Sequence, residues 1–275
     1  MLIGISTLVP LNFGIASPLA YIPNTFGPTG LVSVIDTNPN SPDYNTVITI
    51  VPAEGKRPLD ISMHPAGTSI YAVNLLSNNV SVIDTNPDSL KYNTVIAKVP
   101  VGTNPHGVAV NPAGTYVYVT TLDDNVYVID AVSNLVETTI SEGVGNDPEG
   151  VAVNPAGTRV YVGSVNEHSV SVIDTDSYST DYNTVIAIVP VGQQPNGVAV
   201  NPAGTRVYVA NRNSGTVSVI DTSTNTVIAT VNLVCEGNAP SYPYGVAVSP
   251  AGIHVYVANS TCDNVYVIDA TTNTV

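Results

Sequence analysis

The chain lacks tryptophan, has two phenylalanines and two cysteines, and carries just seven lysines and arginines among 275 residues. Two cysteines are too few for a disulfide framework that would replace a hydrophobic core. Because 21 aspartates and glutamates give a net charge of −14, the surface repels phosphate backbones, which argues against nucleic acid as a partner. No apolar run reaches the roughly 20 residues of a membrane-spanning helix, so we expect no membrane span.

Helical periodicity is missing as well, and short runs of Val, Ile and Tyr alternate with turn residues along the chain. The stretch from Pro195 to Val231 shows this pattern clearly. Within it, Pro202 presets φ and Gly204 accepts a positive φ, which favours a tight turn. The stretch therefore predicts an up-and-down sheet of four antiparallel strands. The four apolar runs are Val198–Val200, Val207–Ala210, Val217–Ile220 and Val227–Val231.

Copies of this unit fill the chain, and a Val-Ile-Asp sequence ends the third run of each copy. The aspartates recur every 44 to 48 residues, at Asp36, Asp84, Asp130, Asp174, Asp221 and Asp269. A period of this length with four strands per unit is typical of a β-propeller. Six periods account for residues 1–275, so we predict an all-β, single-domain, closed six-bladed β-propeller with four-stranded antiparallel blades.

The two ends of the sequence complement each other. The last unit stops before its fourth strand, whereas the segment Ile3–Pro10 resembles the fourth strand at Val185–Pro190. We therefore expect the N-terminal strand, Met1–Val9, to complete the last blade. This pairing would close the ring and remove both exposed sheet edges.

The sequence Pro202–Asn211 (PAGTRVYVAN), followed by Val217–Thr222 (VSVIDT), resembles the YVTN family of β-propeller repeats. The likeness covers nearly the whole chain and is strongest from Pro105 to Asp269. Since that family occurs in archaeal and bacterial surface-layer and surface-antigen proteins, the resemblance implies an extracellular or cell-surface location. Familiar surface-layer members of that family have seven blades, whereas this chain has six repeats. Similar propellers occur in lactonases and some lyases, but no catalytic motif of these enzymes matches here.

Variation between the repeats is concentrated where the chain enters the innermost strand of each blade, in a Pro-X-Gly sequence. We expect the X residues to surround one mouth of the central channel, with Asp60 beside them in the second unit. The opposite face carries uniform Pro-Ala-Gly turns. Variation on one face is typical of a ligand-binding surface, but it is also typical of loops whose sequence varies without a functional cause. The candidate ligand-binding ring consists of His106, Glu149, Asn196, Tyr244 and Asp60.

A carboxylate, an imidazole and an amide that face one channel are able to hold a cation, which makes Glu149, His106 and Asp60 the metal candidates. We expect no cofactor in the main interpretation. Calcium-dependent six-bladed lactonases place acidic and amide residues in a similar way, so calcium is the ion that the enzymatic alternative implies. Three acidic loops, which begin at Asp36, Asp84 and Asp174, favour Asx turns instead, because they lack the glycine and distal glutamate of a calcium loop.

These observations predict a non-enzymatic recognition or scaffold module, extracellular or on the cell surface, that binds protein or glycan through its variable face. The alternative is a metal-dependent hydrolase of the lactonase type with its site at the channel mouth. Cys235 and Cys262 occupy two loops of the last repeat on that same face. We therefore predict a disulfide between them, in an oxidising compartment.

Overall fold

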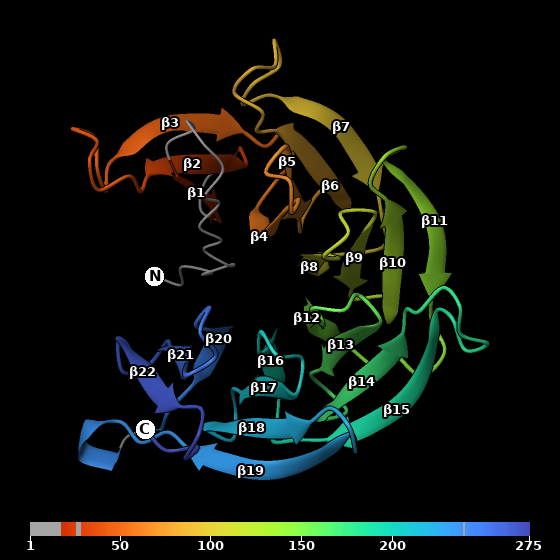
Figure 1. Ribbon diagram of the computed structural model, residues 1–275, viewed down its shortest axis with the longest axis vertical. Coiled ribbons are helices and arrows are strands. Elements are labelled where there is room, and N and C mark those ends of the chain that lie inside the picture. Colours follow the sequence, from red (N-terminus) through yellow and green to blue (C-terminus); the bar gives the residue numbers. More distant parts are fainter. Residues whose placement is uncertain (1–17, 26–28, 239) are drawn as a thin grey trace.

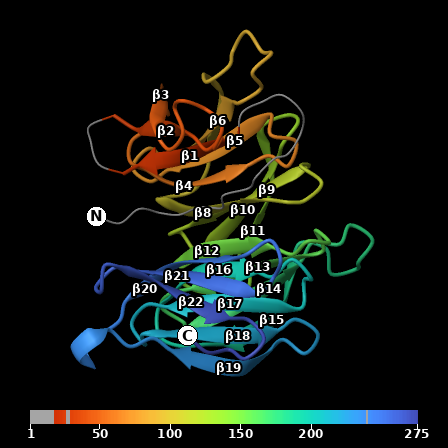
Figure 2. The same ribbon diagram turned by 60° about the vertical axis from the view of Figure 1, so that its left-hand side comes forward.

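The computed structural model describes residues 18–25, 29–238 and 240–275. Within these ranges the chain forms 22 β-strands in six antiparallel sheets and one short 3₁₀-helix, η1 (Glu236–Asn238). The sheets follow one another around a ring in chain order (Figures 1 and 2). The fold class, a propeller of six blades, is thereby confirmed.

Four sheets have four strands each, and their order in space follows the sequence. The second sheet contains β4 (Pro58–Met63), β5 (Ser69–Asn74), β6 (Asn79–Asp84) and β7 (Val95–Pro100). The third contains β8 (Pro105–Val110), β9 (Tyr116–Thr121), β10 (Asn125–Asp130) and β11 (Leu135–Ile140). The fourth contains β12 (Pro148–Val153), β13 (Arg159–Ser164), β14 (Ser169–Asp174) and β15 (Thr184–Pro190). The fifth contains β16 (Pro195–Val200), β17 (Arg206–Asn211), β18 (Thr216–Asp221) and β19 (Thr226–Asn232).

The first and last sheets have three described strands each. The first contains β1 (Leu19–Asn24), β2 (Leu31–Asp36) and β3 (Val47–Pro52), and the sixth contains β20 (Pro243–Val248), β21 (His254–Asn259) and β22 (Asn264–Asp269). By register, the first sheet corresponds to the outer three strands of a full blade and the sixth to the inner three. The predicted pairing of Met1–Val9 with the last blade lies outside the described residues.

The sheets pack face to face, so most strands bury side chains on both of their faces. Between the fifth and sixth sheets, Tyr208 and Val219 pack in one cluster with Val255, Val257 and Ile268. The corresponding tyrosines Tyr71, Tyr118, Tyr161 and Tyr208 are all fully buried. The apolar residues on both faces of the repeats are therefore core positions.

On the face opposite the candidate ring, glycines with positive φ and side-chain hydrogen bonds stabilise the turns. Gly204 has a φ of +69°, and the side-chain oxygen of Asn201 accepts hydrogen bonds from the amides of Thr205 (2.8 Å) and Arg206 (3.0 Å). The acidic loops are closed in a related way. There, Asp84 Oδ1 accepts from the amide of Asn86 at 2.9 Å, which is the Asx turn that the sequence favours.

No helix among the described residues is long and apolar enough to cross a membrane.

The burial of the repeated tyrosines gives a first prediction. Tyr161→Ala should lower the free energy of unfolding by about 3–5 kcal/mol, because the variant leaves a cavity between the fourth and fifth sheets. Tyr178→Ala is the control, since Tyr178 lies exposed in the loop after β14 and its loss should change stability by less than about 0.5 kcal/mol. Urea unfolding followed by circular dichroism measures both, and equal losses would contradict the packing argument.

Candidate functional site

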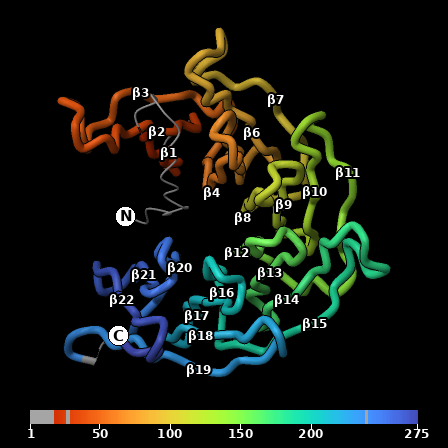
Figure 3. Tube along the Cα trace, in the orientation of Figure 1, coloured from red at the N-terminus to blue at the C-terminus, as the bar shows by residue number. Residues whose placement is uncertain are grey.

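The candidate ring lies where the inner strands begin. β4, β8, β12, β16 and β20 are the strands nearest the centre (Figures 1 and 3), and each starts at the proline of its Pro-X-Gly or equivalent sequence. Regular pairing with the second strand is interrupted directly after this proline; in the fifth sheet it stops after Pro195 and resumes at Val198. This irregularity releases Asn196 from the ladder and leaves it at the channel mouth.

Close approach between blades explains the glycine of the same sequence. A Cβ atom on Gly107 would overlap the backbone oxygen of Glu149, and one on Gly150 would overlap that of Asn196. The glycines therefore let each inner strand lie against the X residue of the next blade. As a result, X residues of consecutive blades are brought side by side.

Three predicted ring residues form one connected group. His106 Nδ1 lies 3.3 Å from Glu149 Oε1, and the amide nitrogen of Asn196 donates a hydrogen bond to Glu149 Oε2. The side chains of His106 and Glu149 are both largely buried. The hydrogen bond from Asn196 fixes the carboxylate. His106 Nδ1 is buried and forms no hydrogen bond with the described residues, so the imidazole lies beside the carboxylate without being bonded to it.

Thr120 supports this group from the third sheet. Its hydroxyl accepts from the amide of Gly107 at 2.8 Å and donates to the backbone oxygen of Glu149 at 2.6 Å. The ring prediction did not include Thr120. The sequence nevertheless marks Thr120 as an exception, because the residues at the same position of the second strand in the other repeats have no hydroxyl group. These residues are Pro23, Val73, Gly163, Ala210 and Ala258.

Asp60 has a different environment. It stands where other inner strands have glycine, and its carboxylate accepts from the amides of Val108 (3.0 Å) and Ile61 (2.8 Å). Burial raises the pKa of Asp60 to about 6, although both hydrogen bonds favour the charged form. Asp60 thus joins the second and third blades through the backbone instead of binding His106.

Tyr244 lies within range of charges from both sides of the mouth. Burial raises the pKa of its phenol to about 12, and the negative charges of Glu149 and Asp60 add to this, whereas Arg212 and Arg57 oppose it. The phenol therefore keeps its proton at neutral pH and is able to donate a hydrogen bond.

Asp147, which precedes the fourth inner strand, adds a further carboxylate to this region. Burial raises the pKa of Asp147, and the charge of Glu149 raises it further. Its Oδ1 atom is buried and has no hydrogen-bond partner among the described residues. Asp147 is not among the predicted ring residues, because its distance from Glu149 depends on the path of the connection.

The three metal candidates do not converge. His106 and Glu149 lie together, whereas Asp60 accepts backbone amides. In the part of the chain that the structure describes, no three His, Cys, Asp or Glu side chains are grouped as metal ligands. Calcium at this mouth stays an untested alternative. Of the three metal candidates, His106 and Glu149 lie side by side.

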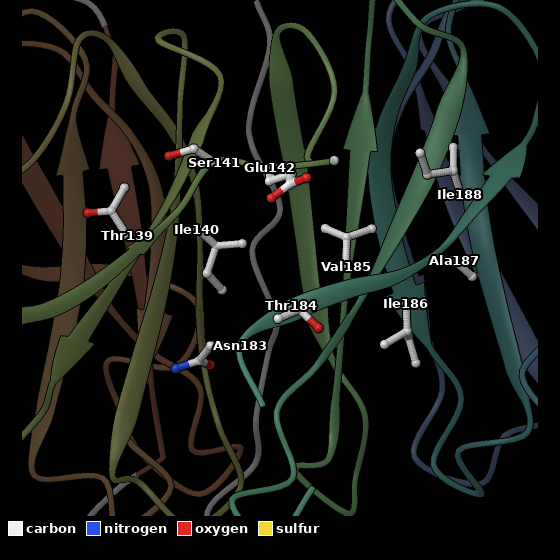
Figure 4. A pocket seen from close by; sticks show the side chains of 11 residues that line it. Thr139, Ile140, Ser141, Glu142, Asn183, Thr184, Val185, Ile186, Ala187 and Ile188 are labelled. Carbon is white, nitrogen blue, oxygen red and sulfur yellow. The ribbon is translucent and has the colours of Figure 1, made fainter. Parts of the chain in front are cut away.

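A groove with a volume of about 810 Å³ lies elsewhere, on the outer rim between the outermost strands of the third and fourth sheets (Figure 4). Its floor includes Ile140 and Val185, and Glu142 is its one titratable side chain. No candidate ring residue lines it. The groove therefore offers apolar surface without the groups needed for acid–base chemistry.

Cys235 and Cys262 form a disulfide, with their Cα atoms 5.8 Å apart. The bond joins the connection before β20 to the loop after β21. The amide nitrogen of Asn259 lies beneath it, donating to Ser241 Oγ at 2.7 Å. The disulfide thus ties together the loops of the sixth blade on the face that bears the ring.

The sequence matches one known protein family. The profile of the family described as "Lactonase, 7-bladed beta-propeller" matches residues 31–193 and 145–232. The chain belongs to this family. The described residues of this lactonase-family chain form six sheets, one fewer than the family's description states.

A likeness to solved structures agrees with the fold. The hydrazine synthase of Kuenenia stuttgartiensis superimposes with a TM-score of 0.77 at 22% identity, covering 92% of this chain and 73% of that one. At this identity the likeness shows a shared propeller architecture. No curated protein sequence matches the chain.

The raised pKa of Asp60 gives a second prediction. Since the folded pKa of about 6 exceeds the ordinary value of 3.8, the free energy of unfolding should fall as pH rises from about 4 to about 6. The expected fall is on the order of 1–2 kcal/mol, less than the full pKa shift would give, because Asp60 is only partly buried. Asp60→Asn should remove it. Chemical unfolding at a series of pH values measures the effect.

Asp88→Asn is the matched control, because Asp88 lies exposed in a loop on the opposite face. It should leave the pH profile unchanged. A wild-type profile that is flat between pH 4 and 6, or one that Asp60→Asn does not alter, would show that Asp60 is not the group responsible.

Proposed function

We propose that this chain hydrolyses a lactone at the channel mouth, with His106 as the general base. The observation that carries the proposal is the group of His106, Glu149 and Asn196, in which a largely buried carboxylate, hydrogen-bonded by Asn196, lies 3.3 Å from the imidazole. Membership of a lactonase family supports the reaction class. A positioned base with an orienting carboxylate is the arrangement that activates water in many hydrolases.

The step assigns a role to each group. No described residue forms a hydrogen bond with Nε2 of His106, so this nitrogen is free to take a proton from water. The resulting hydroxide attacks the lactone carbonyl, and the bond between the carbonyl carbon and the ring oxygen breaks. The proton returns from His106 to the ring oxygen, which yields the hydroxy acid. Tyr244, which keeps its proton at neutral pH, donates a hydrogen bond to the developing oxyanion.

The setting that we propose is extracellular or cell-surface. The Cys235–Cys262 disulfide supports an oxidising compartment, and the repeat sequence around Tyr208 supports a YVTN-type, surface-layer-like propeller. Recognition of a protein or glycan without turnover is the second candidate function. What favours it is the concentration of variable side chains on one face, which binding alone would also require.

The third prediction tests the base. If the wild-type protein hydrolyses any of γ-butyrolactone, δ-valerolactone, glucono-δ-lactone or an N-acyl homoserine lactone, His106→Gln should lower kcat about 100-fold or more, because general-base catalysis typically contributes that much. Glu149→Gln should also lower kcat. His254→Gln is the control, since His254 begins β21 on the opposite face, and it should keep wild-type kcat. The rates are measured by pH-stat titration of the acid that hydrolysis releases.

Two further measurements separate the alternatives. An EDTA-treated sample that loses activity and regains it with calcium supports the metal-dependent form of the hypothesis. A wild-type protein that is inactive on the whole panel, but binds a glycan with an affinity that His106→Gln lowers, supports recognition instead. Hydrolysis that persists unchanged in both His106→Gln and Glu149→Gln would rule out this mouth as the catalytic site.

A further inference from the structure

Two side chains that depart from the repeat bind the backbone directly after His106. The first is Thr120 in β9, which is fully buried and whose hydroxyl accepts from the amide of Gly107 at 2.8 Å. The second is Asp60 in β4, whose carboxylate accepts from the amide of Val108 at 3.0 Å. The two amides that follow His106 are thus held by one side chain of the third blade and one of the second blade.

The propeller does not require these two hydrogen bonds. Thr120 stands where the other second strands have no hydroxyl, and Asp60 stands where the other inner strands have glycine. Around Glu149, in the next blade, the equivalent positions are Gly163 and Gly107. Since glycine has no side chain that could accept a hydrogen bond, the fourth blade forms without either of them.

The bonds occur where the sheet itself gives the backbone little support. His106 and Gly107 of β8 lie opposite Thr120 of β9, between two regular pairs of the ladder. Such an interruption leaves backbone groups without ladder partners and lets the strand bend. The hydroxyl of Thr120 therefore replaces a ladder bond beside His106.

The same hydroxyl also reaches the fourth blade. While it accepts from the amide of Gly107, it donates to the backbone oxygen of Glu149 at 2.6 Å. One side chain thus joins the backbone beside the imidazole to the backbone of the residue that carries the carboxylate. β4, β8 and β12, which carry Asp60, His106 and Glu149, lie next to one another around the centre (Figure 3).

The separation of His106 and Glu149 depends on this backbone. Nδ1 lies 3.3 Å from Oε1, but it forms no hydrogen bond with a described residue, so no side-chain bond maintains this distance. Asn196 fixes the carboxylate, which leaves the place of the imidazole to the backbone of β8. A displacement of about 1 Å is able to lower a catalysed rate on the order of 100-fold, so the support of this backbone matters for chemistry at the mouth.

We propose that Thr120 and Asp60 are positioning residues for His106. Together they hold the backbone that follows it, and Thr120 sets its separation from Glu149. Neither takes part in proton transfer, because both act on backbone groups. The catalytic consequence rests on the proposed hydrolysis, whereas the positioning itself does not.

The fourth prediction removes the hydroxyl of Thr120. Thr120→Val keeps the shape of the side chain, and β5 has valine at the equivalent position, Val73. This variant should lower kcat about tenfold or more and change KM less than about twofold, since it displaces the base and leaves the binding groups in place. Thr120→Ser keeps the hydroxyl and should restore most of the wild-type kcat. The rates are measured by pH-stat titration on the same lactones.

Thr175→Val is the matched control for a buried threonine. The hydroxyl of Thr175 donates to the backbone oxygen of Gly157 at 3.0 Å, on the face opposite the ring. Its loss should leave kcat at the wild-type value. A purely structural role of Thr120 would make the two valine variants alike.

Nuclear magnetic resonance supplies a measurement that needs no activity. In ¹⁵N-labelled protein, Thr120→Val should shift the ring signals of His106 and speed hydrogen exchange at the amide of Gly107 about tenfold or more, because that amide loses its acceptor. The ring signals of His254, on the opposite face, should not move. Asp60→Gly restores the glycine of the other repeats and should also shift the His106 signals, so it decides if Thr120→Val does not fold.

Three results would overturn the proposal. The first is that the ring signals of His106 stay unchanged in Thr120→Val and Asp60→Gly. The second, in an active protein, is a loss of kcat in Thr120→Val no larger than that in Thr175→Val, and the third is a failure of Thr120→Ser to restore what valine removes. A wild-type protein that is inactive on every lactone contradicts the proposed function alone, and shifted His106 signals would then still support the positioning.

Discussion

The structure depends on the packing of each β-sheet between two others. Val and Ile on both faces of a strand are stable in water only if both faces are covered, at a gain of about 25 cal/mol for each Å² of apolar surface removed from water. A ring meets this demand because every sheet has a neighbour on each side. The buried tyrosines Tyr118, Tyr161 and Tyr208 occupy the same place in successive interfaces. One interaction, repeated, therefore specifies the architecture.

The candidate site follows from the same packing. Inner strands approach so closely that glycine is required opposite the next backbone oxygen, as at Gly150, and the ladder is interrupted just before that point. The residue between the proline and the glycine is then free of ladder pairing. Its identity is not restricted by the fold, which is why histidine, glutamate, asparagine and tyrosine occupy equivalent positions in successive blades. Chemistry at the mouth can change while the propeller stays the same.

This division explains what the sequence predicts and what it does not. The blade count, the strands and the turn at Asn201–Gly204 follow from local patterns repeated six times, and the structure confirms the six blades. The ring positions could also be placed, since they share one position in the repeat. Contacts across blades could not be predicted, because they depend on side-chain directions and distances. Glu149 accepts a hydrogen bond from Asn196 and lies 3.3 Å from His106, while Asp60 accepts from the amide of Val108. Thr120 was overlooked because it acts through a backbone atom of another blade.

The proposed function draws on both the family assignment and the geometry of the channel mouth. A propeller fold is compatible with many activities, and the likeness to hydrazine synthase at 22% identity extends only to architecture. The lactonase profile indicates a reaction class but names no residue of this chain. The group of His106, Glu149 and Asn196 places an imidazole 3.3 Å from a carboxylate, and the protonated phenol of Tyr244 lies within range of the charge of Glu149. Lactone hydrolysis requires water activation and oxyanion stabilisation, and the proposed function assigns the first to His106 and the second to Tyr244.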